Sequence, residues 1–233
     1  VTGMSPRNVA HICSLYNLPP SQTAVIPPWS QSLGLDKVRV GRAAARRSRE
    51  FNDDCRYLVF GGQLTNGRSF PAAVRLLAHA RRLGVNLVLD VYSKGPEFDR
   101  LRDESTESWI RFRDAIPREH YVGLLQSYDF GLAVTDPNVS LPTFPSKIVE
   151  YLGHGLPAIC MLESESDVEE FLGSKYSIHV NNFDESDDAV RDLVSFIAKA
   201  SMADERVLQA SLSRDRFSTV AIVGRIETLL NDS

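Results

Sequence analysis

Between residues 56 and 180, six short apolar runs alternate with stretches that have helical periodicity. The runs are 56–62, 85–92, 109–112, 130–135, 156–162 and 176–180. Short apolar runs separated by amphipathic helices are typical of βαβ units, in which parallel strands are buried on both faces. Right-handed crossovers then bring helices to both sides of the sheet. The sequence therefore predicts an α/β fold: a Rossmann-like, doubly wound parallel sheet of about six strands with helices on both faces.

The first 55 residues lack this alternation. They contain a helical stretch at 8–18, an apolar strand at 23–29 that runs into prolines, and a basic helical stretch at 41–50. We therefore expect two parts: residues 1–55 form the end of a preceding domain plus a linker, and residues 56–233 form the Rossmann-like domain. The helices expected in that domain lie at 71–84, 117–128, 145–155, 166–173, 184–200 and 218–230.

Composition argues against several classes of protein. The net charge of −4 gives no basic excess for binding nucleic acid. No apolar run reaches the roughly 18 residues that a membrane span needs. Cys13, Cys55 and Cys160 are too scattered to form a disulfide framework or a zinc site. We therefore expect a cytoplasmic protein with reduced thiols and no metal site.

Two loops at the expected ligand edge carry residues suited to a phosphorylated ligand. Ligands of open α/β sheets bind beyond the carboxyl ends of the strands. After the first run, Gly62 lets the backbone approach a phosphate, Gln63 follows it, and Arg68 adds positive charge. After the second run come Ser93 and Lys94. The alternatives stay open, because a tight turn also needs glycine and a solvated loop also carries lysine.

A long loop follows the fourth run and leads into the helix at 145–155. Long loops in this position are often functional. Pro145 suits the first turn of a helix, so backbone N–H groups over 143–147 are expected to be unpaired and available to an anion. Lys147 and Glu150 share one face of this helix. They could form an ordinary surface ion pair, but their place in the first turns of an apolar helix favours contact with a ligand.

Five segments together resemble the C-terminal half of a retaining glycosyltransferase of the GT-B fold, of the group 1 or family 4 type. They are VIPPW at 25–29, YLVFGGQLTNGR at 57–68, DVYSKGPE at 90–97, the stretch 109–134, and PSKIVEYLGHGLPAI at 145–159. The last block is the most specific of them, and the resemblance covers roughly residues 23–231. In this family the C-terminal domain binds a nucleotide-activated sugar and the N-terminal domain binds the acceptor.

The resemblance also implies roles for particular residues. Glu150 would hold the ribose hydroxyls of a UDP- or GDP-linked sugar, with Ser93 and Lys94 on the same nucleotide side. Gln63 and Arg68 fall where the family often has an arginine and a lysine that neutralise the diphosphate. No metal is implied, because helix dipoles and basic residues do that work. The residues implied for the diphosphate and the sugar are Gly62, Gln63, Arg68, Thr143, Phe144, Pro145, Ser146 and Lys147.

Two departures from the family pattern keep other functions open. Pro142 stands where many relatives have a glutamate that reaches the donor sugar, and Gln63 replaces an arginine, for which Lys147 could compensate. The alternatives are a sugar-nucleotide 2-epimerase of the same fold and a non-catalytic module that binds nucleotide sugars. The favoured function is donor binding in an enzyme of polysaccharide biosynthesis, whose saccharide or lipid-linked acceptor binds to an N-terminal domain. Alone, this chain is expected to transfer little sugar.

A basic cluster precedes the Rossmann-like part. It consists of Arg42, Arg46, Arg47 and Arg49. It could contact anionic lipid at the inner membrane face or the preceding domain. A solvated helix face is the favoured interpretation.

Overall fold

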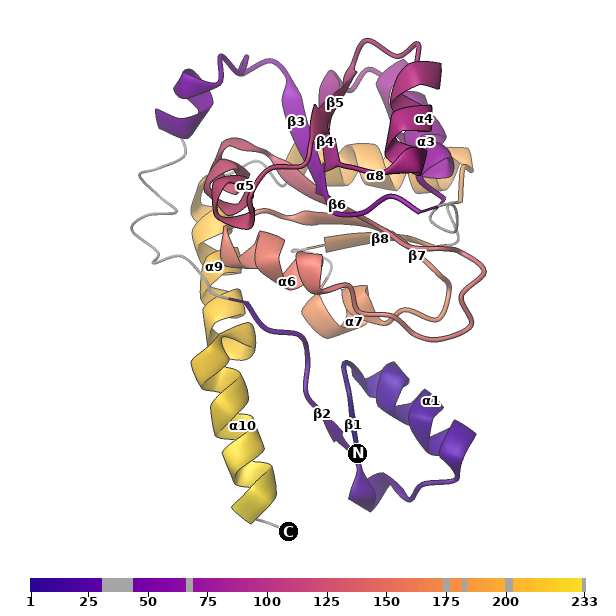
Figure 1. Cartoon of the computed structure of the whole chain (residues 1–233), viewed down its shortest axis with the longest axis vertical. Coiled ribbons are helices and arrows are strands. Elements are labelled where there is room, and N and C mark those ends of the chain that lie inside the picture. Colours follow the sequence, from indigo (N-terminus) through magenta and orange to yellow (C-terminus); the bar gives the residue numbers. More distant parts are fainter. Residues whose placement is uncertain (31–43, 66–68, 174–176, 182–183, 200–202, 232–233) are drawn as a thin grey trace.

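A six-stranded parallel sheet forms the centre of the computed structural model, which describes residues 1–30, 44–65, 69–173, 177–181, 184–199 and 203–231 (Figure 1). The strand order is β5-β4-β3-β6-β7-β8. All neighbouring strands in it pair in parallel. The strands are β3 (Arg56–Gly61), β4 (Leu87–Ser93), β5 (Ile110–Asp114), β6 (Phe130–Val134), β7 (Ala158–Leu162) and β8 (Ser177–Asn181). Each strand falls on one of the six apolar runs, which confirms the predicted fold class.

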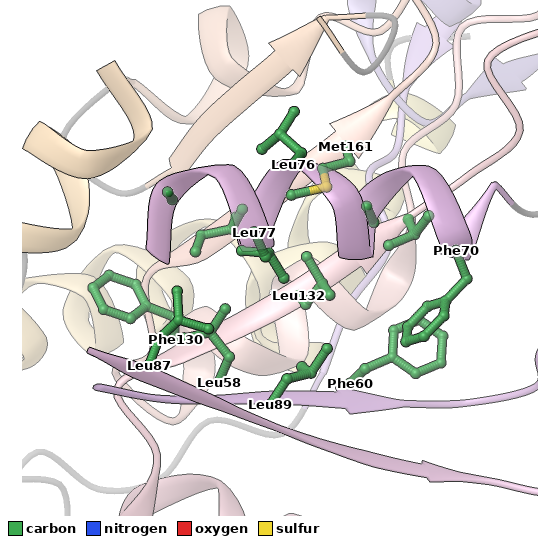
Figure 2. Packing of buried hydrophobic residues seen from close by; sticks show 14 of the residues in the cluster. Leu58, Phe60, Phe70, Leu76, Leu77, Leu87, Leu89, Phe130, Leu132 and Met161 are labelled. Carbon is green, nitrogen blue, oxygen red and sulfur yellow. The ribbon is translucent and has the colours of Figure 1, made fainter. Parts of the chain in front are cut away.

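Helices cover both faces of this sheet, because the inner strands alternate their buried side chains between two apolar clusters. One cluster lies under α3 (Phe70–Arg82), α4 (Pro96–Glu104) and α8 (Asp187–Lys199). Figure 2 shows Leu76 and Leu77 of α3 packed over side chains of the sheet. The other cluster lies under α5 (Arg118–Leu124), α6 (Ser146–Gly153), α7 (Val168–Leu172) and the end of α9 (Ala203–Phe217). The last helix, α10 (Thr219–Asn231), continues away from the sheet (Figure 1).

Two helices of the domain, α4 and α9, have no counterpart among the expected ones. In α4 the single buried residue is Phe98, so the helix has too few apolar positions to give a periodic signal. In α9 polar residues occupy the buried face, where Arg206, Gln209 and Ser213 are at most 3% exposed. Hydrophobic periodicity finds helices that bury apolar side chains and misses helices of this kind.

The N-terminal segment forms a small unit beside the domain. It contains β1 (Thr2–Gly3), α1 (Pro6–Tyr16), a 3-10 turn η1 (Pro20–Gln22) and β2 (Ala24–Val25), and β1 pairs with β2 in parallel. The expected strand at 23–29 is short, because prolines follow it and cannot donate to a ladder. The unit touches the domain through the Arg7 N–H, which donates to Asp167 at 2.8 Å, and the Asn8 amide, which donates to the Pro142 carbonyl at 3.0 Å. The boundary at residue 55 stays a prediction.

The basic cluster is not a solvated helix face, so that interpretation is wrong for two of its members. Residues 44–48 are helical as expected, but Arg46 is 8% exposed and pairs with Asp129 at 3.0 Å. Arg49 donates to the hydroxyls of Tyr92 and Tyr128, each at 2.9 Å. Buried acceptors on the sheet face draw both guanidinium groups inward. Arg47 is exposed, and Arg42 lies outside the described residues.

No helix in the described part of the chain is long and apolar enough to cross a membrane.

Candidate functional site

A cavity of about 390 Å³ opens at the carboxyl ends of β3 and β4, beside the N-terminal ends of α5 and α6. The strand order reverses between β3 and β6, and such a switch point is where ligands of doubly wound sheets bind. The residues that line the cavity come from four segments: Gly61, Gly62, Gln63, Tyr92, Ser93, Lys94, Ala115, Ile116, Arg118, Tyr121 and Glu150.

Five of the residues predicted for the site line this cavity together. They are Gly62, Gln63, Ser93, Lys94 and Glu150. They reach it from the ends of two strands and from one helix. Arg68 lies outside the described residues. Whether these side chains bind a ligand stays a prediction.

The two positions at the end of β3 each require glycine, for different structural reasons. Gly62 has a φ of 131°, a backbone conformation that side chains disfavour. A Cβ on Gly61 would come within 2.1 Å of the Tyr121 ring, which therefore packs directly against the strand. The Gly62 N–H donates to the Tyr92 carbonyl at 3.1 Å. This N–H group is thus engaged in the protein, and the close approach of backbone and ring shapes the cavity.

Two tyrosines form one wall of the cavity. The rings of Tyr92 and Tyr121 meet edge to face, with centroids 5.8 Å apart. The Tyr92 hydroxyl accepts a hydrogen bond from Arg49. Behind it lies the fully buried Asp90 carboxylate, which accepts from Arg111 at 2.5 and 2.8 Å. This buried polar network fixes the wall from the far side, because each charge in it has a partner.

Glu150 presents a buried carboxylate to the cavity. Its side chain is 12% exposed and pairs with Arg118 of α5 at 2.5 Å, while the Arg118 side chain is 76% exposed. Burial raises the pKa of Glu150, and the charges of Arg118 and Lys147 act against that rise. The Lys147 ammonium lies 4.0 Å from the centroid of the Phe60 ring. A Cβ on Gly62 would come within 3.3 Å of that ammonium, so Lys147 adjoins the glycine loop.

The loop between β6 and α6 is anchored by Glu163, which the sequence analysis did not single out. Glu163 is fully buried at the end of β7. Its carboxylate accepts from the Thr143 N–H at 2.6 Å, from the Thr143 hydroxyl at 2.9 Å and from the Thr135 hydroxyl at 2.8 Å. The expectation that the Thr143 N–H is unpaired and available to an anion is therefore wrong. Glu163 lies 20 residues after Thr143 in the sequence, so the residues of the loop itself do not indicate this hydrogen bond.

The rest of this loop serves partly to pack the domain. The Phe144 side chain is 2% exposed, and its ring lies 5.6 Å from that of Phe171. Its side chain therefore belongs to the core and does not face the cavity. Pro145 caps α6, whose first residue is Ser146. The first-turn N–H groups of this helix point toward the ligand edge of the sheet, as helix geometry requires.

Replacing Glu163 with alanine is expected to destabilise the protein by about 1–3 kcal/mol, because the partly buried Thr143 N–H and the hydroxyls of Thr143 and Thr135 lose their acceptor. Urea unfolding monitored by circular dichroism would measure this change in the free energy of unfolding. The matched control is Glu165→Ala, since Glu165 is exposed two residues further on and should change stability by less than about 0.5 kcal/mol. Equal effects of the two substitutions would contradict the role assigned to Glu163.

Five cavity residues were missed by the sequence analysis. They are Tyr92, Ala115, Ile116, Arg118 and Tyr121. Four of them follow β5, and the strand-end rule could have found them. The segment 117–128 was interpreted as a helix alone, so its first residues were not considered as part of the site. No three His, Cys, Asp or Glu side chains in the described ranges come together in a way that could hold a metal ion.

Solved structures share this fold. A glycosyltransferase from Rickettsia africae superposes with a TM-score of 0.72 at 12% identity, covering 100% of this chain. A TarM mutant from S. aureus, solved with UDP among its ligands, gives 0.70 at 9% identity over 99% of the chain. Starch synthase IV from Arabidopsis thaliana, bound to ADP and acarbose, gives 0.65 at 11% identity over 100%. The chain has the fold of a GT-B glycosyltransferase domain.

These three GT-B glycosyltransferases are longer than this chain, which spans 43 to 62% of their length. No family model matches the sequence. No curated protein matches it either. The similarity is therefore one of fold, and it supports the resemblance to the C-terminal half of these enzymes.

Proposed function

We propose that this chain is the donor-binding domain of a glycosyltransferase and binds a nucleotide-diphosphate sugar. The observation that carries the proposal is the buried Glu150 carboxylate in a cavity at the switch point of the sheet. A carboxylate accepts hydrogen bonds from two neighbouring hydroxyls, which suits the diol of a ribose. That other proteins of this fold were solved with UDP or ADP supports the same class of ligand.

The charges around the cavity suit a diphosphate. Lys94 lines it, and Lys147 adjoins its glycine loop. The first turn of α6 adds the positive end of a helix dipole. In sugar transfer the nucleoside diphosphate leaves with additional negative charge, and fixed positive groups stabilise that charge in the transition state. We propose that Lys147, Gln63 and Ser146 meet the diphosphate and the sugar.

The described residues that line the cavity account for the donor side of the proposed reaction. We propose that a saccharide or lipid-linked acceptor binds to an N-terminal domain facing the cavity, at the cytoplasmic face of the membrane. A GT-B 2-epimerase would need additional carboxylates and a histidine as general acid and base. Among the described residues that line the cavity, Glu150 is the one carboxylate and no histidine occurs. This composition favours transfer over epimerisation.

Titration of the chain with UDP, GDP and ADP should show binding of at least one nucleoside diphosphate with a Kd below about 1 mM, measured by isothermal calorimetry. Stabilisation by mass action gives a second measurement: ligand at 100 times its Kd adds about 2.7 kcal/mol and raises the melting temperature. The free sugars serve as controls without phosphate. If none of the diphosphates or their sugar conjugates binds, the donor-binding function is wrong.

A further inference from the structure

We propose that Arg118 is a positioning residue: it is the counter-ion that keeps the Glu150 carboxylate charged and ready to accept hydrogen bonds from a pair of ligand hydroxyls. The proposal deepens the proposed function and rests on it. Lys147 shares a helix face with Glu150, but the structure assigns Arg118, from a different helix, as the ion-pair partner of Glu150.

The geometry of the pair is asymmetric. Arg118 is the first residue of α5, and its Nη2 lies 2.5 Å from Oε1 of Glu150 on α6. The carboxylate is buried in the wall of the cavity, with a side-chain exposure of 12%, while the guanidinium reaches it from solvent, with 76% exposed. Both residues line the cavity. The ion pair therefore lies where a ligand would enter, and it engages one oxygen while the carboxylate retains further lone pairs.

The other groups near Glu150 are poorly suited to act as its counter-ion. Tyr121 and Tyr151 are neutral at physiological pH, because burial raises the pKa of both hydroxyls well above the usual value. His154 follows the last residue of α6, and burial, with a smaller effect of Arg118, lowers its pKa to about 4. It is therefore uncharged at pH 7. None of these three side chains carries a positive charge at pH 7, so only basic residues can act as the counter-ion of Glu150.

Other basic residues on the neighbouring elements oppose the burial of Glu150 less, or bind elsewhere. Lys147 lowers the pKa of Glu150 less than Arg118 does, and its ammonium lies over the Phe60 ring. Lys94 lines the cavity from the end of β4. Arg206 of α9, which packs against α6, donates to the backbone carbonyls of Tyr128 and Asp129. Arg118 thus provides the largest opposing charge to the burial of Glu150.

Removing Arg118 is expected to raise the pKa of Glu150. Burial already raises the pKa of Glu150, and removing the nearest cation raises it further. A protonated carboxyl donates one hydrogen bond and cannot accept from two hydroxyls with both oxygens. Affinity for a diol ligand should therefore fall with decreasing pH, and in an Arg118 variant this fall should begin at a higher pH than in the parent protein.

The test is calorimetric titration of the full chain with UDP, or with whichever diphosphate it binds, between pH 5.5 and 8.5. Arg118→Gln should bind within about threefold of the parent at pH 8.5 and at least about tenfold more weakly at pH 6, a difference of about 1.4 kcal/mol. Arg118→Lys should restore most of the parent profile. Arg118→Gln combined with Glu150→Gln should show no pH dependence of this kind. Arg100→Gln is the matched control, since Arg100 pairs with Glu97 and Glu104 on α4.

Two results would overturn the proposal. One is an unchanged pH profile in Arg118→Gln. The other is a loss of affinity in Arg118→Gln that is equal at every pH, that occurs with UDP and that does not occur with uridine. That result would make Arg118 a phosphate contact instead.

A measurement without ligand separates this inference from the donor-binding function. When folding raises the pKa of a carboxyl, the protein loses stability as the pH rises through the pKa of that group in the folded state. Relative to the parent, Arg118→Gln should therefore become progressively less stable between pH 5 and 8 in thermal unfolding. The difference should vanish when both proteins also carry Glu150→Gln. If no nucleotide binds and this stability pattern still appears, the pairing stands and the donor-binding function fails. If the pattern is absent, the counter-ion role fails.

Discussion

Substitution of Glu150 by alanine is expected to weaken binding of a nucleoside diphosphate by about 10- to 100-fold. Hydrogen bonds to a charged group contribute about 1.5–3 kcal/mol, and each 1.4 kcal/mol is a factor of ten in affinity. The carboxylate is buried in the cavity wall, so solvent would replace it poorly as an acceptor. Calorimetric titration at pH 8 measures the loss.

A ligand variant provides the matched comparison for Glu150. A 2′-deoxynucleoside diphosphate lacks one of the two hydroxyls, so the parent should bind it more weakly while Glu150→Ala should discriminate little between the two ligands. Glu227→Ala is the protein control, because Glu227 is exposed on α10. Affinity retained in Glu150→Ala, with the same preference for the ribonucleotide, would refute the assignment of the ribose contact.

Substitution of Gly131 by alanine is expected to destabilise the domain by about 1–3 kcal/mol or more, as overpacking of a core does. A Cβ at Gly131 would come within 2.1 Å of the ring of Tyr151, which is fully buried under the sheet. The Tyr151 hydroxyl donates to the Leu132 carbonyl at 3.2 Å, so the ring has little freedom to withdraw. In a protein of this size the melting temperature should fall by about 2–4 °C per kcal/mol.

Gly224→Ala is the control for this substitution, because a Cβ at Gly224 of α10 meets no described atom within 4 Å. Alanine in a helix interior should stabilise it by roughly 0.5–1 kcal/mol. The same Gly131 variant should also bind nucleotide more weakly, since Tyr151 follows Glu150 on α6. A melting temperature within 1 °C of the parent would show that the sheet accommodates the methyl group.

The strands were predictable because each is determined locally. A run such as 130–135 is apolar throughout, and a strand buried on both faces needs nothing else to identify it. The helices α3, α6 and α8 carry apolar residues at helical spacing and were found for the same reason. Helix α9 was missed, since its buried Gln209 and Arg206 would be read as surface residues from sequence alone.

The sequence by itself determined the sheet and the residues that follow each strand. In a parallel sheet the carboxyl ends of all strands lie at one edge, and ligands bind at that edge. Gly62 and Lys94 were placed at that edge in this way, and both line the cavity. Only the tertiary structure decided their partners. Arg118 reaches Glu150 from another helix, and the Glu163 carboxylate accepts a hydrogen bond from the Thr143 N–H. Such pairings depend on distances between elements that are remote in the chain, which periodicity and turn chemistry do not encode.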